Sequence, residues 1–199
     1  IGHTALTANV DGCRMVAIGQ GALSTNTTGD FNVAVGYAAL ALNTGSNNTA
    51  IGCGSLSSNT TGIENTAVGT LTLADNTTAN GNSAFGTCAL RENTTGTFAT
   101  AVGFSALKNN TTATSNTAMG YEALCTTQTG ASNVAFGRAT LKNNTGNSNS
   151  ALGHLALCTN TSGECNTAVG NGSMRCNTTA SNNTAVGISS LFANTTGAE

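Results

Sequence analysis

The chain has few of the side chains that build an ordinary globular core. Of its 199 residues, charged residues make up 7% and aromatics 4%, and tryptophan and proline are absent. A shortage of aromatic and other large apolar groups is typical of disorder. The net charge of −2 shows no excess of lysine and arginine, so we do not expect nucleic acid as a partner. No apolar run approaches the ~20 residues needed to cross a bilayer, so we expect no membrane insertion.

A strict repeat argues against disorder. The stretch Asn65–Gly69 (Asn-Thr-Ala-Val-Gly) returns in close or looser form along the whole chain, at a spacing of 17 residues with two 16-residue exceptions. A short fixed period is the signature of a repeat architecture. Counting each repeat from the apolar residue before glycine, repeats begin at Ile1, Ile18, Val35, Ile51, Val68, Phe85, Val102, Met119, Phe136, Leu152, Val169 and Val186. We therefore expect one continuous array over residues 1–199, either part of a longer array or a unit that stacks end to end.

The consensus predicts an all-β solenoid, or β-roll, of about twelve 17-residue coils. It reads apolar-Gly-x-x-(Ala/Ser/Thr)-Leu-x-x-Asn-Thr-Thr-Gly-x-x-Asn-Thr-Ala, with glycine at position 2 in all twelve repeats. Positions 15 to 2 indicate a short strand with large side chains on one face and small ones on the other. We expect position 1 and Leu at position 6 to be buried, and the Ala/Gly face to meet a neighbouring chain.

The rest of each coil is less well defined by its pattern. Positions 2, 5, 6 and 9 also fit helical spacing, so the second limb is a strand or a short helical turn, and we favour the strand. The Thr-Thr-Gly segment then turns the chain. Most copies have glycine at position 12 and so can adopt a positive φ, although Ala79, Ala113 and Ala180 replace it.

Asparagine recurs at position 9 in eleven of twelve repeats, with Thr127 as the exception. Stacked amides can bond to the amides above and below, which predicts a structural ladder. Its expected members are Asn26, Asn43, Asn59, Asn76, Asn93, Asn110, Asn144, Asn160, Asn177 and Asn194. Many of these also lie in Asn-x-Thr/Ser sequons, but an asparagine buried in a ladder cannot carry a glycan. Among the sequons outside this row, we take those at Asn47, Asn109, Asn143 and Asn182 as candidates for glycosylation.

The sequence offers no catalytic or metal-binding constellation. The two histidines, His3 and His154, are nine coils apart, and the seven cysteines form no CxxC pair. Only Cys158 and Cys176 lie on adjacent coils at neighbouring positions, where a disulfide could form. No insertion interrupts a repeat to build a deep pocket. We therefore expect no enzyme, no metal and no cofactor.

Two stretches, Asn32–Leu40 and Asn116–Leu124, carry an Asn-Thr-Ala-Val-Gly-Tyr-x-Ala-Leu style of repeat. This pattern resembles the head repeats of trimeric autotransporter adhesins, and also the Asn-Thr-Ala-Val-Gly arrays of tail-fibre-like proteins from phages and large viruses. The resemblance covers the whole chain, and no binding residue of those families has a matching position here. It implies a left-handed, trimeric β-roll outside the cell, used for attachment.

These observations predict a non-enzymatic fibre, extracellular or on a cell or virion surface, that is structural or adhesive. Its expected partners are copies of itself, as a trimer or a head-to-tail fibre, and a cell-surface or glycan target. The alternative is an ice-binding solenoid, because threonine holds position 10 in ten of twelve repeats. A paired Thr-x-Thr rank is absent, which favours the fibre.

Overall fold

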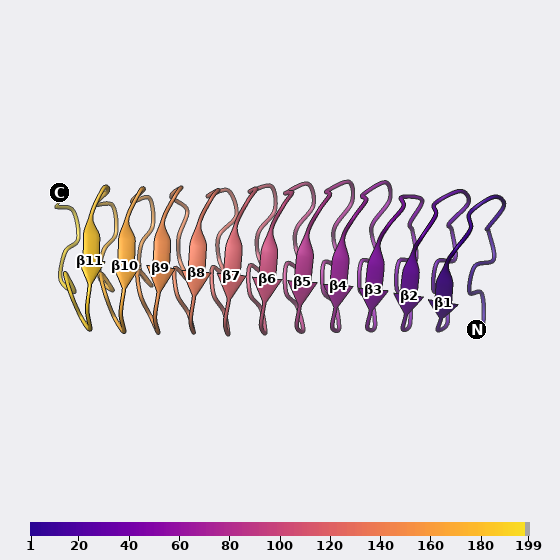
Figure 1. Cartoon of the computed structure of the whole chain (residues 1–199), viewed down its shortest axis with the longest axis horizontal. Coiled ribbons are helices and arrows are strands. Elements are labelled where there is room, and N and C mark those ends of the chain that lie inside the picture. The colour runs from indigo at the N-terminus through magenta and orange to yellow at the C-terminus, as the bar shows by residue number, and fades with distance from the viewer. Residues whose placement is uncertain (198–199) are drawn as a thin grey trace.

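The computed structural model describes residues 1–197 as a straight rod of stacked coils (Figure 1); the last two residues of the expected array lie outside it. Each coil contributes one three-residue strand to a single parallel sheet, in sequence order from one end to the other. The strands are β1 Val16–Ile18, β2 Val33–Val35, β3 Thr49–Ile51, β4 Thr66–Val68, β5 Ser83–Phe85, β6 Thr100–Val102, β7 Thr117–Met119, β8 Val134–Phe136, β9 Ser150–Leu152, β10 Thr167–Val169 and β11 Thr184–Val186. The predicted all-β solenoid is confirmed.

The register of the sheet follows the repeat. Ala17 pairs with Ala34, Ala34 with Ala50, and so on along all ten strand pairs, through both 16-residue repeats. The shortened repeats lose their residue in the turn, so the strands stay aligned. With adjacent strands ~4.8 Å apart, the sheet is about 48 Å long from β1 to β11.

The second limb is a pair of tight turns, in place of the favoured strand or the helical turn. In the second coil the amide of Ala22 donates to the carbonyl of Gly19, and that of Asn26 to the carbonyl of Leu23. Between coils, the amide of Leu23 donates to Ala39 O at 3.1 Å. These bonds between coils satisfy backbone groups without a second sheet.

Leucine at position 6 has a positive φ in every coil, for example 51° at Leu107. This left-handed conformation costs a residue with a Cβ roughly 1–2 kcal/mol. The side chain is nevertheless fully buried in each interior coil, with Met174 taking the same place in one. Burial of such a side chain is worth about 1.5–3 kcal/mol, which is enough to hold the conformation.

Glycine at position 2 is required by the approach of neighbouring coils. Gly103 has a φ of +130°, and a Cβ placed on it would lie 2.7 Å from the carbonyl oxygen of Gly120. At position 12 the expected positive φ is wrong for the described residues. A Cβ on Gly96 would also lie close to a backbone atom, the carbonyl oxygen of Ala113, so what separates the two positions is the absence of a positive φ at position 12, where alanine is found in three coils.

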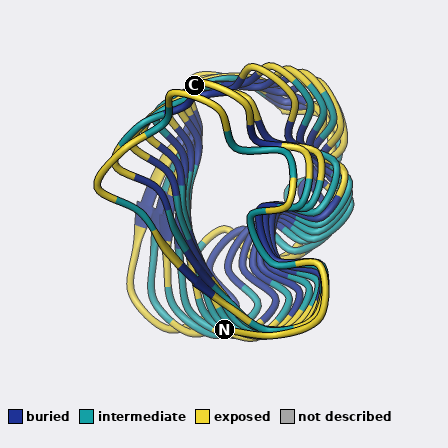
Figure 2. Cartoon of the chain, turned by 90° about the vertical axis from the view of Figure 1, so that its right-hand side faces the viewer, coloured by how far each residue is buried: buried dark blue, intermediate teal, exposed yellow. Residues whose placement is uncertain are grey.

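The core is a narrow channel filled by two kinds of side chain. Alanine at position 17 points inward from the strand, and leucine at position 6 fills the space beside it, in one continuous cluster. Viewed along the rod, buried residues line the inside of the coils, one behind the other (Figure 2). Each repeat buries too little to fold alone, so stability depends on contacts with its neighbours.

Candidate functional site

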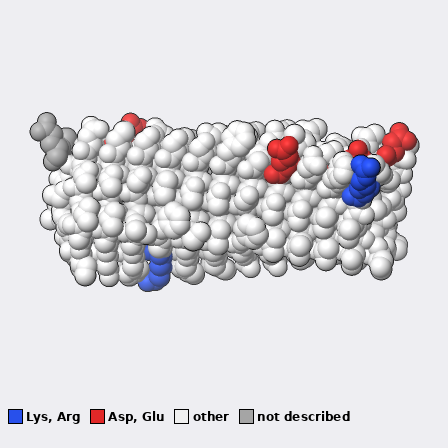
Figure 3. Space-filling model, in the orientation of Figure 1, with Lys and Arg blue, Asp and Glu red and all other residues white. Residues whose placement is uncertain are grey.

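The outer side of the sheet is a regular surface that runs along the rod from β1 to β11. Each strand turns its first and third side chains outward, for example Ser83 and Phe85 on β5. We name this surface the sheet face, and define it as the outward side chains of β1–β11. None of these strand residues carries a charge. Figure 3 shows few charged side chains in this view, and several of them lie toward the right-hand end.

This orientation overturns the expectation for the two faces of the strand. The large residue of position 1 was expected inside and the small face at a partner; instead alanine at position 17 is buried and position 1 faces outward. Phe85 is 42% exposed and Leu152 is 52% exposed. The reason is space, because the leucine of the second limb fills the channel and leaves room for only a methyl group opposite it.

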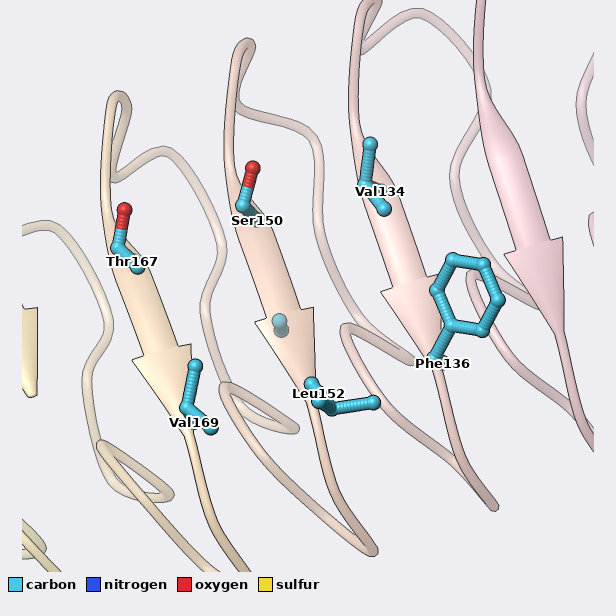
Figure 4. Close-up of a pocket in the computed structure, with 7 residues that line it drawn as sticks. Val134, Phe136, Ser150, Leu152, Thr167 and Val169 are labelled. Atoms are coloured by element: carbon cyan, nitrogen blue, oxygen red, sulfur yellow. The ribbon is translucent and has the colours of Figure 1, made fainter. Parts of the chain in front are cut away.

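A shallow apolar hollow of about 380 Å³ interrupts the sheet face at β8–β10. It is lined by Val134, Phe136, Ser150, Ala151, Leu152, Thr167 and Val169. Ser150 is smaller than its row neighbours Val134 and Thr167, which opens the space over Ala151 (Figure 4). The hollow holds no charged group, so its chemistry suits an apolar side chain.

A second cluster lies at position 3 of successive coils, where the chain leaves the sheet. The rings of Phe104 and Tyr121 stack at 5.5 Å between centroids. The guanidinium of Arg138 lies 5.9 Å from the Tyr121 centroid, and its Nη1 is 3.1 Å from Nε2 of His154. Sequence reasoning missed this row, although the residue types at position 3 could have shown it.

The described residues contain a single ion pair, beside this row. Lys142 Nζ donates to Oε2 of Glu122 at 2.8 Å. This hydrogen bond holds the pKa of Glu122 below its usual value, helped by the charges of Lys142 and Arg138. The same bond raises the pKa of Lys142. Both groups are therefore charged at neutral pH.

The predicted asparagine ladder is present at position 9. Asn76 Nδ2 donates to Asn59 Oδ1 at 2.7 Å, and Asn93 Nδ2 to Asn76 Oδ1 at 3.0 Å. Each amide also bonds to the carbonyl at position 12 of its own coil, as Asn93 does to Gly96 at 2.9 Å. All ten expected members, from Asn26 to Asn194, make such a bond. The row is structural and offers no free polar group to a ligand.

Position 15 forms a second asparagine ladder of a different kind. Asn48 Oδ1 accepts from the backbone amide of Asn65 at 3.0 Å. Its Nδ2 donates to the carbonyl of Gly62 in the next coil at 2.8 Å. These side chains replace backbone bonds where the chain bends into the strand.

The candidate glycosylation sites separate from the ladder by burial. Asn47, Asn143 and Asn182 are exposed, and Asn109 is half-buried. The interior position-9 sequons are buried, as Asn59 and Asn93 are. Burial therefore excludes none of the four candidates, and their glycosylation stays a prediction.

The remaining sequence candidates do not converge on a site. Within residues 1–197 every cysteine is a free thiol, so Cys158 and Cys176 form no disulfide. No group of three or more metal-ligating side chains occurs among the described residues. His3 and His154 lie far apart along the rod. Over the same residues, no helix has the length and apolar character needed to span a bilayer.

Comparison with protein-family models, with curated proteins and with solved structures gave no match to this chain. The functional argument therefore rests on the surfaces of the rod itself.

Proposed function

We propose that this chain is a non-enzymatic fibre segment, extracellular or on a cell or virion surface, with a structural or adhesive role. The observation that carries the proposal is the unbroken sheet β1–β11, in one register with no insertion between coils. Such a rod is stiff and presents its turns at a fixed spacing. Weak contacts at repeated turns then add by multivalency.

The sheet face is the surface through which copies of the chain associate in this proposal. It is free of charge and carries a continuous apolar row along one side. Its length of about 48 Å and width of about 10 Å amount to roughly 500 Å² per copy. Two copies would bury roughly 1,000 Å², the lower limit for a specific interface. A second copy of this chain has a complementary face of the same length.

Light scattering across a concentration series tests this proposal, using the wild type and Val102→Glu. Val102 lies half-buried on the outer side of β6, where a glutamate stays solvated in a single rod but would be desolvated between copies. Thr112→Glu adds the same charge to an exposed turn of the same coil and is the matched control. Circular dichroism would show that both variants keep the fold.

We expect a fixed mass of two or three chains for the wild type and Thr112→Glu, and a single chain for Val102→Glu. If the mass instead grows with concentration, and Val102→Glu does not change this growth, the chains assemble end to end and not through the sheet face. A wild-type monomer at all concentrations would overturn the self-associating fibre.

Ice binding is the alternative, and the outward threonines of the sheet favour it. Thr49, Thr66, Thr100, Thr117, Thr167 and Thr184 form much of one row. The position-10 threonines are less suited, because their hydroxyls donate to carbonyls of the next coil, as Thr60 does to Thr77 at 3.0 Å. Thermal hysteresis that is lost in Thr117→Glu would support this function; its absence at high protein concentration would dismiss it.

A further inference from the structure

The cations of this chain are unevenly placed. Four of its six lysines and arginines lie within residues 102–185: Lys108, Arg138, Lys142 and Arg175. We name these four side chains the basic flank. Lys108, Lys142 and Arg175 all occupy position 7, and Arg138 lies at position 3 of the same coil as Lys142. Over the same residues the acids are Glu122 and Glu164, and Glu122 is bound to Lys142.

Position 7 places the cations in a straight line. Lys108, Lys142 and Arg175 belong to every second coil, so at ~4.8 Å per coil they repeat at about 9.6 Å. Arg91 occupies the same position in the coil before Lys108 and extends this row by one coil. Cys125 and Cys158 fill the coils between those three cations, and burial raises the pKa of both thiols. The thiols therefore stay neutral at neutral pH. Glu122 offsets the charge of Lys142, so Lys108, Arg138 and Arg175 carry the positive charge of the flank that no ion pair offsets.

The guanidinium of Arg138 is held in place before any ligand arrives. It packs over Tyr121, and its Nη1 contacts His154. A preorganised guanidinium loses less freedom when it binds a carboxylate or sulfate. Its planar fork also matches the two oxygens of such a group.

The aromatic rings beside the flank disfavour single-stranded nucleic acid as the ligand. That class of ligand stacks its bases on open ring faces. Here Phe104 and Tyr121 stack on each other, and Arg138 covers the second face of Tyr121. Phe104 is 50% exposed and keeps its other ring face open, but one open face does not provide the row of stacking platforms that successive bases need.

We propose that the basic flank binds a linear acidic polysaccharide, with carboxylate or sulfate groups along the chain. The step between cations is close to the length of a disaccharide in an extended polysaccharide, so successive charged sugars can meet successive cations. This proposal specifies a ligand for the adhesive role proposed above, and its biological setting rests on that role. Binding itself needs only a single rod.

Binding to immobilised heparin and to polygalacturonate, at low and at high ionic strength, tests the proposal with the folded chain. The test variant is Arg138→Gln combined with Arg175→Gln. Its control is Arg14→Gln, because Arg14 makes the same kind of contact with Phe31, at 5.0 Å, outside the basic flank. Circular dichroism confirms folding, and light scattering on the same samples follows self-association.

We expect the double variant to bind about tenfold more weakly, the size that loss of two exposed ion pairs predicts. Arg14→Gln should bind as the wild type does, and high salt should weaken all binding. Equal weakening in Arg14→Gln, or no binding to either polysaccharide, would overturn the proposal. The proposal would also be overturned if the chain bound an oligonucleotide or anionic vesicles but neither polysaccharide, and if the double variant lost that binding. In every case light scattering measures self-association independently of polysaccharide binding, so a failure of this proposal can be told apart from a failure of the proposed fibre.

Discussion

The side-chain amide of Asn93 joins three consecutive coils. Its Nδ2 donates to Oδ1 of Asn76 at 3.0 Å, and its Oδ1 accepts from Nδ2 of Asn110 at 2.8 Å. A third bond from Nδ2 closes the turn at Gly96. Because all three amides are buried, water cannot replace a bond that is lost.

Asn93→Ala should therefore destabilise the rod strongly. It leaves Asn76 Oδ1 and the Gly96 carbonyl without this donor, and an unpaired buried polar group costs about 1–3 kcal/mol. Chemical denaturation followed by circular dichroism measures the loss. Asn93→Thr is the matched control, because Thr127 occupies this row and its hydroxyl donates to the carbonyl of Asn144 at 2.8 Å. If Asn93→Ala costs no more than Asn93→Thr, the ladder is not stabilising.

Gly103→Ala should cost about 2–5 kcal/mol, from a strained φ and a clash with the carbonyl of Gly120. The comparison is Gly21→Ala, also at a positive φ. There the added Cβ meets only Ala38, at 3.9 Å, and Ala38 itself adopts a φ of 53°. Thermal unfolding should separate the two variants clearly. Equal melting temperatures would show that the coils can move apart to admit a methyl group at position 2.

Leu107→Ala should cost about 2–5 kcal/mol, because it opens a cavity in the channel where this coil has no other large buried apolar side chain. Leu107→Met should cost less than about 1.5 kcal/mol. Met174 already fills the same position four coils away, at a φ of 49°. Denaturant unfolding midpoints measure both changes. A large loss in Leu107→Met would mean that the left-handed backbone at position 6 requires leucine's branching.

Most of the fold could be predicted from the period of the sequence. It was enough to predict the all-β solenoid with a 17-residue coil, buried Leu at position 6 and the ladder at position 9, because stacking places equal positions above one another. It could not decide which side of the strand lies inside. Ser83, Ala84 and Phe85 alternate small and large residues, and only the width left by the opposite limb makes alanine the buried one.

The backbone conformation of the second limb also could not be predicted from the sequence pattern. Leu107 and Ser105 adopt φ values of 51° and 54°, which residues with a Cβ seldom do. The bonds to neighbouring coils impose these values, so no local propensity signals them. Glycines at position 4, such as Gly21 and Gly54, were the available hint. The basic flank could have been found from the sequence, because its members share position 7 or lie beside it.

The pair Lys142–Glu122 should make a small contribution to stability that depends on pH. The folded pKa of Glu122 is lowered by its bond to Lys142, so its contribution is present above the unfolded value of about 4.3 and is lost as pH falls through the folded pKa. The folded pKa of Lys142 is raised, so its contribution is present below about 10.4 and is lost as pH rises through its folded pKa. The side chains are 36% and 25% exposed, so the pair is worth no more than about 1 kcal/mol.

Carboxyl NMR titration of the wild type and Lys142→Gln measures this coupling directly. The midpoint of Glu122 should rise in Lys142→Gln, while Lys108→Gln should change it less. An unchanged midpoint in Lys142→Gln would mean that the ion pair does not persist in solution.

Glycosylation should follow burial and not the sequon count. When the chain is expressed through a eukaryotic secretory pathway, we expect glycans on the exposed Asn47, Asn143 and Asn182. We expect none on Asn59, since its Nδ2 donates to Asn43 Oδ1 at 2.6 Å and to Gly62 O at 2.9 Å inside the ladder. Glycopeptide mass spectrometry gives the occupancy of each sequon, and Asn47→Gln should remove its own glycan without changing the melting temperature. A glycan on Asn59 would have to be added before the coils stack, and the rod would then lack that step of its ladder; finding it on folded protein would contradict the buried amide row.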